Sequence, residues 1–327
     1  MFKFDFRARP PYDITTKINM GDEANAFYSV AFDDPTPPSA DKKDMGLFWE
    51  ELDEAGIDMF FYCGRRFNPL IINMLAPTCD VPLDEESNNR AVAEFITKYP
   101  DKAVGAYCVD PSDGLKACEA IAENVLNGPF QAVTMEPGIS RVPMPADDVR
   151  CYSIYEYCEK NHIPMTLTFG ELNNRSLRHV QPQIMDNICE LFPDLLLTAI
   201  HGGWPYVTEI CYVAYNRHNF YVCPDQLINY HSPGFQDYQT ACNYLLQDKM
   251  IYATCYPFHS MVSMTKKYED FLRPGAKEKV MGINGLRALN LEHLIPEGSP
   301  KRWPDQVNIA PKKDFKETFM ENHVLPL

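Results

Sequence analysis

Leu195 to Trp204, with the sequence LLLTAIHGGW, decides the fold of this chain because an apolar run ends abruptly in a histidine and two glycines. The leucines are typical of a buried core, and the threonine and isoleucine that follow favour a strand. Gly202 and Gly203 allow a sharp backbone turn without the steric cost of a Cβ atom. His201 is therefore predicted at the carboxyl end of a buried strand, where parallel α/β proteins bind ligands. A hydrogen-bonded core histidine is the alternative that this stretch alone leaves open.

The composition is that of a large globular protein. The 327 residues are 45% hydrophobic, which is enough to bury either one barrel-sized domain or two ordinary ones. The formal net charge of -15 argues against binding to nucleic acid or to an anionic membrane surface, and no run of basic residues opposes this. A small-molecule substrate is the expected partner, and the sequence leaves a homo-oligomer open.

The sequence favours a cytoplasmic location. The amino-terminal residues MFKFDFRARP lack a charged lead followed by an apolar core, and no run of about eighteen apolar residues occurs in the chain. The 11 cysteines are scattered singly through apolar segments, without a CxxC pair. We expect most of them to be small buried hydrophobic side chains in a reducing compartment.

Apolar segments of strand length recur along the chain and alternate with segments of helical character. The first strand alternates strictly, with Phe2, Phe4 and Phe6 on one face and charged side chains on the other. The other predicted strands are the stretch quoted above and residues 58–65, 103–110, 131–136, 163–169, 220–223 and 251–255, and the first strand covers residues 2–9. The predicted helices cover residues 42–55, 88–98, 114–126, 147–160, 182–191, 206–215, 238–246 and 276–289.

This alternation predicts a single (β/α)8 TIM-barrel domain over residues 1–327. The proline-rich residues 10–40 form a long irregular excursion after the first strand. A doubly wound open sheet is the rival fold, but it normally has fewer strands and a glycine-rich first turn, and the motif GxGxxG is absent. In a barrel the active site lies at the carboxyl ends of the strands, which gives as candidates Arg7, Arg9, Cys63, Arg65, Asp110, Glu136, Thr168, His201, Asp225 and Cys255.

Five longer segments carry a resemblance to a known family: MGLFWEELDEAGID, FITKYPDKAVGAYCVDP, AIHGGWPYVTEICYVAYNRHNFYV, IYATCYPF and KVMGINGLRALNL. In these segments the chain resembles the amidohydrolase superfamily, in the branch of amidohydrolase-related decarboxylases, hydratases and lactonases. The resemblance covers nearly the whole chain. It implies a barrel enzyme that acts on a small molecule.

The resemblance breaks at the metal ligands. Members of that family usually hold a divalent metal with Asp-x-His-x-His on strand one, a histidine on each of strands five and six, and an aspartate on strand eight. The matching positions here hold Arg7, Arg9, Thr168 and Cys255, and only His201 is retained. Because a guanidinium group cannot donate a lone pair and carries a fixed positive charge, we expect no metal in the usual place and no other cofactor. A substitute zinc site built from His201, Cys255 and His259 is the alternative.

The two arginines lie two residues apart on the first strand, so both are predicted to point into the barrel lumen, with Asp5 on the same face. Arg7 and Arg9 could clamp a substrate carboxylate or enolate, since the planar guanidinium binds such anions through two hydrogen bonds. The alternative is an Arg-Asp-Arg ion-pair network that only fills the lumen. Arg65 and Thr168 are further candidates for binding substrate, and Trp204 and Tyr256 are expected to wall the pocket.

His201 is the predicted proton carrier, because its unperturbed pKa lies nearest neutrality. Cys255 is a candidate nucleophile or acid, or else a small buried hydrophobic side chain. Glu136 is a candidate general base, or else a carboxylate on a surface loop. Three functions stay open: a metal-independent hydrolase such as a lactonase or ring-opening enzyme for a small anionic or cyclic-ketone substrate, a decarboxylase or other lyase, and a non-catalytic binding protein on the same scaffold.

Overall fold

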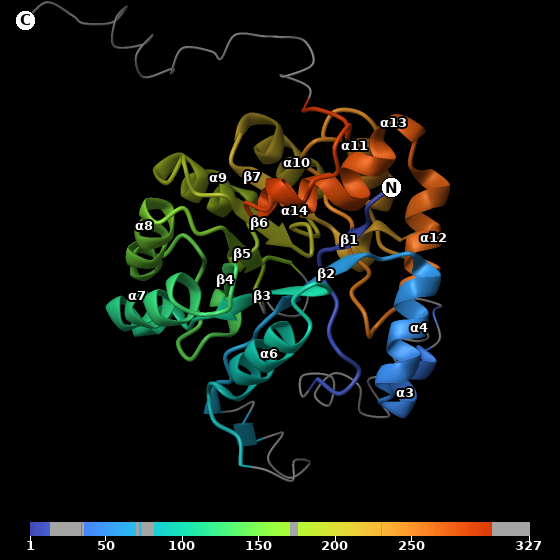
Figure 1. The fold of residues 1–327 in the computed structure, drawn as a ribbon. Helices are drawn as coiled ribbons and strands as arrows, with labels where there is room; N and C mark the ends of the chain where they lie inside the picture. The colour runs from blue at the N-terminus through green and yellow to red at the C-terminus, as the bar shows by residue number, and fades with distance from the viewer. Residues whose placement is uncertain are drawn as a thin grey trace, which may run out of the picture.

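The computed structural model describes residues 1–13, 34, 36–69, 72–73, 82–170, 176–229 and 231–302. Most of the predicted excursion over residues 10–40 therefore lies outside the described residues. The strands form one parallel sheet in which each strand pairs with the next along the chain (Figure 1). They are β1 (Phe4–Asp5), β2 (Met59–Cys63), β3 (Ala103–Cys108), β4 (Ala132–Met135), β5 (Met165–Thr168), β6 (Leu197–Ile200) and β7 (Phe220–Cys223).

The eighth predicted strand is an extended segment rather than a regular strand. Residues 250–255, which we call the closing segment, lie between β7 and β1. Ile251 N donates to Val222 O at 2.9 Å, and Phe6 N donates to Tyr252 O at 3.1 Å. Thr254 N also donates to the carboxylate of Asp5, at 2.9 Å. These hydrogen bonds join the two edges of the sheet, so the predicted (β/α)8 barrel is confirmed.

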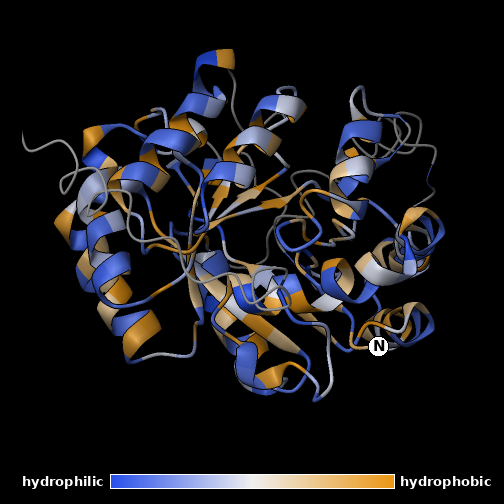
Figure 2. Ribbon diagram, turned by 90° about the horizontal axis from the view of Figure 1, so that it is seen from above, coloured by the Kyte–Doolittle hydropathy of each residue, from blue (hydrophilic) through white to orange (hydrophobic). Residues whose placement is uncertain are grey.

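Helices surround the sheet, and they carry both apolar and polar residues (Figure 2). Their apolar sides contribute to a buried cluster that also contains side chains from the outer faces of the strands. The α-helices are α3 (Pro38–Lys42), α4 (Met45–Ala55), α6 (Ser87–Lys98), α7 (Leu115–Ile121), α8 (Tyr152–Lys160), α9 (Pro182–Leu191), α10 (Val207–Asn216), α11 (Phe235–Asn243), α12 (Met261–Phe271), α13 (Pro274–Glu278) and α14 (Asn284–Ala288). No helix in the described part of the chain is long and apolar enough to cross a membrane.

The sequence prediction missed α12 (Met261–Phe271), which packs against α4 and is the eighth helix of the barrel ring. A local signal for it exists, because the side chain of Ser260 accepts a hydrogen bond from Ser263 N at 3.3 Å and so caps the helix. The helix predicted over residues 276–289 does form, as α13, a π-helical turn (Lys279–Ile283) and α14 in direct succession. It is an addition to the ring rather than its last member.

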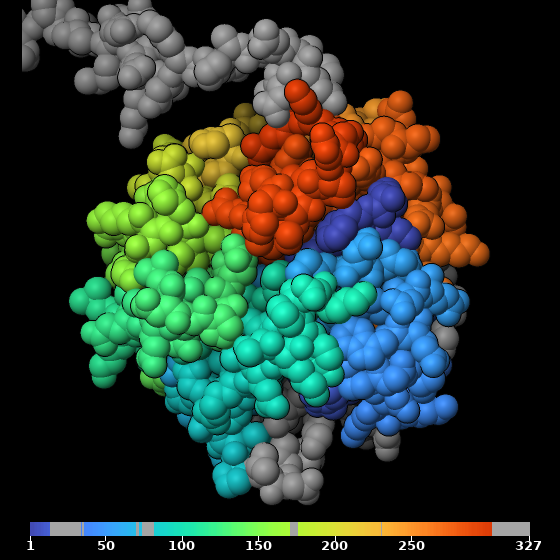
Figure 3. Space-filling view, viewed as in Figure 1, coloured from blue at the N-terminus to red at the C-terminus, as the bar shows by residue number. Residues whose placement is uncertain are grey.

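This added helix covers the amino ends of the strands. A Cβ atom on Gly282 would lie 2.3 Å from the carbonyl oxygen of Phe2, and one on Gly285 would lie 2.7 Å from the ring of Phe4. The two ends of the described chain therefore lie side by side (Figure 3). Because this helix closes the lumen at the amino ends, the lumen can open only at the carboxyl ends of the strands.

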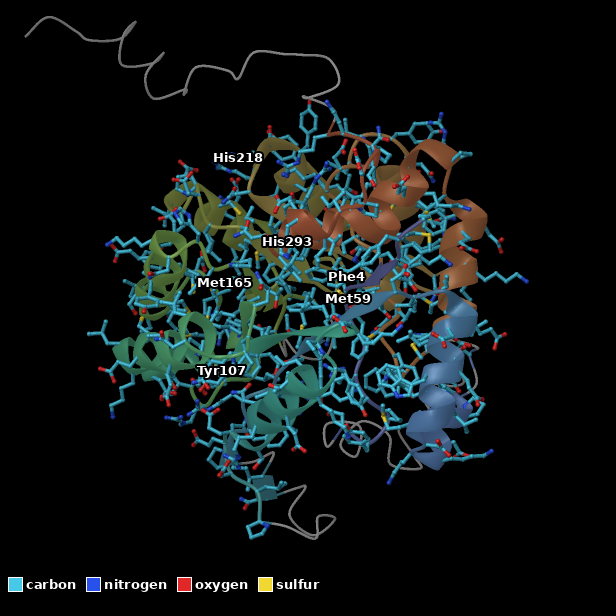
Figure 4. All side chains as sticks on the ribbon, viewed as in Figure 1. Phe4, Met59, Tyr107, Met165, His218 and His293 are labelled. Carbon is cyan, nitrogen blue, oxygen red and sulfur yellow. The ribbon has the colours of Figure 1, made fainter. Side chains whose placement is uncertain are left out.

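The first strand is shorter than predicted, but its apolar face is as expected, because Phe4 and Phe6 lie in one buried cluster and Phe2 packs against it. Only Phe4 and Asp5 pair with β2, and the chain bends at Phe6 and Arg7. Phe4 and Phe6 belong to a buried cluster with Phe61, Tyr221 and Ala253, which come from different sides of the barrel, so aromatic side chains fill its lower lumen. Phe4 and Met59, neighbours across β1 and β2, are labelled in Figure 4.

Asp5 does not pair with an arginine, so the predicted Arg-Asp-Arg network is absent from the described residues. Its carboxylate instead accepts hydrogen bonds from Thr254 Oγ1 at 2.5 Å and from Arg7 N at 3.0 Å. Burial raises the pKa of Asp5 from 3.8 to about 6; the hydrogen bonds from Thr254 and Arg7 lower it in part, and the charge of Asp225 raises it further. Asp5 thus ties β1 to the closing segment.

Because of this raised pKa, we expect the contribution of Asp5 to the free energy of unfolding to depend on pH. Because the folded state holds the proton more tightly than the unfolded state, protonated Asp5 contributes stability below about pH 4, and this contribution is lost as the pH rises through about 6. The free energy of unfolding of the wild type relative to Asp5→Asn should fall by on the order of 3 kcal/mol over that range. Denaturant titrations of both proteins at several pH values measure this difference, and parallel curves would contradict it.

Candidate active site

His201 lies directly after β6, as predicted, and is almost fully buried, with 2% of its surface exposed. Its Nδ1 lies 2.9 Å from Asp225 Oδ2 and 3.2 Å from Oδ1. Asp225 follows β7 and is completely buried. The carboxyl ends of these two neighbouring strands therefore bring together a histidine and a carboxylate that can fix the orientation of its ring.

Three residues at this end of the barrel adopt a backbone conformation that L-amino acids rarely take. The φ angles are 65° for His201, 41° for Asp225 and 58° for Cys255. His201 and Asp225 follow β6 and β7, and Cys255 is the last residue of the closing segment. A positive φ at a residue other than glycine costs on the order of 1 to 3 kcal/mol, and such residues cluster at functional sites. The strained backbone therefore indicates that the fold holds the side chains of these three residues in fixed directions at the carboxyl end of the barrel.

Arg7 reaches the same place from the bend after β1. Its Nε lies 3.7 Å from Asp225 Oδ2, and both side chains are buried. Burial lowers the pKa of Arg7, but its electrostatic interactions with Cys255 and Asp225 more than offset this, so the pKa stands above its usual value. The carboxylate of Asp225 therefore lies between a histidine and a guanidinium group.

Arg9 is also buried, with 7% of its surface exposed, and no carboxylate of the described residues lies within salt-bridge distance of it. Burial lowers the pKa of Arg9, and the nearby positive charge of Arg7 lowers it further. Of these two neighbouring guanidinium groups only Arg7 has a described carboxylate within salt-bridge distance, while the charge of Asp13 acts on Arg9 from farther away. Buried cations of this kind are costly to keep in a folded protein. A bound anion would offset that cost.

Glu136, Arg65 and Thr168 form a second polar group at the ends of β4, β2 and β5. Arg65 holds Glu136 through two hydrogen bonds, Nε to Oε2 at 2.8 Å and Nη2 to Oε1 at 3.1 Å. Thr168 Oγ1 lies 3.4 Å from Glu136 Oε1. Burial raises the pKa of Glu136. The charge and the hydrogen bonds of Arg65 together have the larger, opposite effect, so the pKa lies below its usual value. Glu136 is not a surface-loop carboxylate, and its pairing with Arg65 makes it a weak base.

Two of the cysteines at this end of the barrel lie close to the arginines, and both are buried. Cys255 is 1% exposed and Cys63 is 6% exposed. Burial raises the pKa of Cys63, although the charges of Arg7 and Arg9 act in the opposite direction, so its thiol stays protonated at neutral pH. Cys255 lies close enough to Arg7 and Arg9 for its charge to act on both, and its role as a nucleophile stays a prediction.

The two aromatic side chains predicted to wall the pocket are held in different ways. Trp204 is partly exposed, and its Nε1 donates to Pro233 O at 3.1 Å. Tyr256 is fully buried; its hydroxyl lies 2.6 Å from Ser39 Oγ, and its ring centroid lies 5.3 Å from that of Phe48. Tyr256 therefore connects the end of the closing segment to α3 and α4. Contact of either side chain with substrate stays a prediction.

The residues present do not suit a divalent metal. Among the described residues, no three His, Cys, Asp or Glu side chains come close enough together to hold one. The substitute set of His201, Cys255 and His259 does not form such a group either, and His259 Nδ1 instead lies 3.0 Å from Asp34 Oδ2. The groups nearest to Asp225 are a histidine and an arginine, and an arginine repels a cation.

The partnership of His201 with Asp225 is the part of the site that sequence reasoning missed. Asp225 was expected at a strand end, but nothing local in the sequence assigns it to His201, which lies 24 residues earlier. The order of the strands is the signal that could have revealed it, because consecutive strands of a barrel are neighbours and their carboxyl ends meet at one edge. Arg65 and Glu136, 71 residues apart, are brought together by the same closure of the sheet.

A closed parallel barrel with strained polar residues at the carboxyl ends of its strands defines this protein as an α/β-barrel enzyme. More narrowly, the chain belongs to the amidohydrolase family whose model, described as "Amidohydrolase", matches residues 49–291. No match was found among the curated proteins. The sequence resemblance to the amidohydrolase superfamily is thereby confirmed.

Several solved structures share the fold. An uncharacterized TIM-barrel protein from Bordetella bronchiseptica is 29% identical, with a TM-score of 0.78, and the match covers 90% of this chain and 100% of that chain. A 2,6-dihydroxybenzoate decarboxylase from Rhizobium is 14% identical, with a TM-score of 0.60 and coverage of 89% and 99%. A 4-oxalomesaconate hydratase from Rhodopseudomonas palustris is 16% identical, with a TM-score of 0.57 and coverage of 89% and 96%. The last two likenesses concern the fold alone.

Proposed function

We propose that this protein is a metal-independent hydrolase, a lactonase or ring-opening enzyme that acts on a small anionic or cyclic-ketone substrate. The observation that carries the proposal is the buried pair of His201 and Asp225, at 2.9 Å, with the guanidinium group of Arg7 beside it. This arrangement supplies a base and a positive charge for an anion within one site. Neither group depends on a metal.

In this mechanism His201 acts as the general base. A hydrogen bond from Nδ1–H to Asp225 leaves the lone pair of the imidazole on Nε2, and the buried carboxylate stabilises the imidazolium that forms. Nε2 takes a proton from water as the water oxygen bonds to the substrate carbonyl carbon. The imidazolium then returns that proton to the leaving oxygen or carbon as the ring bond breaks. Water is thus added across the broken bond, and His201 ends as it began.

The arginines provide the charge that stabilises the reacting anion. The oxyanion of the tetrahedral intermediate, or the carboxylate of an anionic substrate, would accept hydrogen bonds from Arg7 and Arg9. Burial strengthens such bonds because water does not compete with them. The same groups indicate the substrate class, because two buried guanidinium groups at one end of the barrel favour a negatively charged substrate.

A decarboxylase is the second candidate. The paired arginines could hold a substrate carboxylate, and the His201 imidazolium could protonate the carbanion that remains after carbon dioxide leaves. Two structurally similar proteins are a 2,6-dihydroxybenzoate decarboxylase and a 5-carboxyvanillate decarboxylase. At 14% identity, these similarities support the fold but not the reaction. An experiment therefore has to distinguish the hydrolase from the decarboxylase.

A library of small lactones, cyclic diketones and aromatic acids, screened by mass spectrometry in water labelled with heavy oxygen, tests the proposal. A hydrolase places the labelled oxygen in its product. A decarboxylase releases carbon dioxide and places a solvent hydrogen on the former carboxyl carbon. Saturable binding without turnover of any member would favour a binding protein and would contradict both reactions.

We also predict that the purified protein carries no stoichiometric divalent metal at the carboxyl end of the barrel. The positions that resemble the ligand sites of the family hold Arg7, Arg9, Thr168 and Cys255, which offer a metal at most a hydroxyl and a thiol beside two cations. Elemental analysis after dialysis measures the content. One equivalent of zinc, manganese or iron that survives dialysis and depends on His201 would overturn both this prediction and the mechanism above.

A further inference from the structure

A groove with a volume of about 930 Å³ opens at the end of the barrel opposite to the candidate active site. It is lined by residues 243–249, which connect α11 to the closing segment, and by the end of α10 and the start of α13. Lys249 and His218 lie just before the closing segment and β7, so the groove is at the amino ends of the strands. Figure 4 shows His218 at the outer side of the molecule. Nothing in the proposed mechanism uses this groove.

Three cationic or titratable side chains gather on one wall of the groove: Lys249, Arg302 and His218. Lys249 Nζ lies 4.9 Å from the ring centroid of Tyr221, and the guanidinium carbon of Arg302 lies 5.9 Å from the same centroid. Burial lowers the pKa of Lys249 to about 7, and the charge of Arg302 contributes to the shift. Burial also lowers the pKa of His218, as do the charges of Lys249 and Arg302. In their charged forms the three groups repel one another, and the lowered pKa values leave Lys249 and His218 only partly charged at neutral pH.

No carboxylate of the described residues lies within salt-bridge distance of Lys249, Arg273 or Arg302. The one acidic residue of the lining, Asp248, is already paired with Lys279 at 2.8 Å and has Arg287 at 3.8 Å. This is unusual in a chain with a net charge of -15, in which carboxylates outnumber basic side chains. Among the described residues, the guanidinium groups of Arg273 and Arg302 therefore have no carboxylate partner, and a bound anion would also favour the charged forms of Lys249 and His218.

The lining of the groove also contains exposed aromatic side chains. The guanidinium carbon of Arg273 lies 4.6 Å from the ring centroid of Tyr244, and Tyr244 is 58% exposed. Tyr215, which also lines the groove, is 60% exposed. Exposed rings next to a guanidinium plane provide stacking surfaces for a flat ligand group. The volume lies within the range of about 300 to 1,000 Å³ that is usual for small-molecule sites.

We propose that this groove is a second ligand site, which binds an organic polyanion with a planar ring, of the class of the nucleoside diphosphates. The phosphate groups lie against Lys249, Arg302 and His218, and the ring stacks on the wall of Tyr244 and Arg273. The proposal is independent of the proposed hydrolase function, because the two sites are at opposite ends of the barrel and share no residue.

Calorimetric titration of the full-length protein with ADP, inorganic pyrophosphate and adenosine tests the proposal at low salt. We expect saturable binding of ADP, with pyrophosphate and adenosine each at least tenfold weaker, because each lacks one of the two recognised parts. Affinity for ADP should fall as salt is raised, since the contacts are ionic. Absence of saturable ADP binding, or binding of adenosine as tight as that of ADP, would overturn the proposal.

Variants at the edge of the groove locate the site. Arg302→Gln and Arg273→Gln should each weaken ADP binding about tenfold or more, because each removes a charged hydrogen bond or a stacking plane. The matched control is Lys160→Gln, which removes an exposed cation from α8, where Lys160 pairs with Glu156. It should leave ADP binding unchanged. Equal affinities in all three variants would place the nucleotide elsewhere and reject the groove as its site.

Discussion

Replacement of His201 by asparagine should lower turnover of the substrate by about a hundredfold or more, the usual contribution of a general acid-base group. Asparagine keeps a polar side chain of similar reach beside Asp225 and tolerates a positive φ, such as the 65° of His201, better than most residues. The fold and the strand end should therefore be preserved. The affinity for substrate should change far less than turnover, because the arginines and not the histidine provide the binding charge.

Steady-state kinetics and a direct binding measurement on the same variant separate these two effects. His293→Asn is the matched control, since His293 is exposed and lies in a short helical turn far along the chain from the site. It should leave turnover unchanged. Normal turnover in His201→Asn would remove this histidine from the mechanism, whichever reaction the enzyme catalyses.

Substitution of Arg7 or Arg9 by methionine should weaken binding of an anionic substrate by about 2 to 5 kcal/mol, the cost of losing a desolvated, charged hydrogen bond. Methionine keeps much of the bulk of the arginine stem and removes the guanidinium group. Arg90→Met is the control, because Arg90 is exposed and pairs with Asp84 on the surface. Dissociation constants of the three variants, measured with the substrate or with a competitive inhibitor, give the result.

Stability distinguishes a binding role from a structural one. Arg9 forms no salt bridge with a described carboxylate, although the charge of Asp13 acts on it, so its removal should lower thermal stability less than removal of Arg7. Arg7 lies beside the buried carboxylate of Asp225, and its removal should destabilise the protein. Normal substrate binding in both variants would reject the anion clamp and leave the arginines with a role in filling the lumen.

Much of the barrel could be predicted from the sequence because its strands and helices are local patterns. The strand over residues 220–223 and the helix over 182–191 have the predicted bounds in β7 and α9, and the buried cysteines agree with their expected role as small hydrophobic side chains. Apolar periodicity and a terminating Gly or Pro are sufficient for such elements. His201 at the end of its strand was predicted in the same way.

The bend after β1 was not predicted, because Phe2, Phe4 and Phe6 alternate with charged residues as they would in a longer strand. Alternation gives the two faces of a strand but not the residue at which pairing stops, which depends on the neighbouring strand. The eighth helix was missed for a different reason. The sequence analysis took the helix over residues 276–289 as the eighth helix of the ring. Only the packing of α12 against α4 shows that α12 completes the ring instead.

The sequence by itself determined the fold class, the end of the barrel that holds the site, and the presence of arginines where the family has metal ligands. The tertiary structure alone decided which charged groups meet: Asp225 with His201 and Arg7, and Glu136 with Arg65. The physical reason is that hydrophobic periodicity acts over a few residues. An ion pair depends instead on closure of the sheet, which brings together side chains that are distant in sequence and buries them where their charges act strongly on one another.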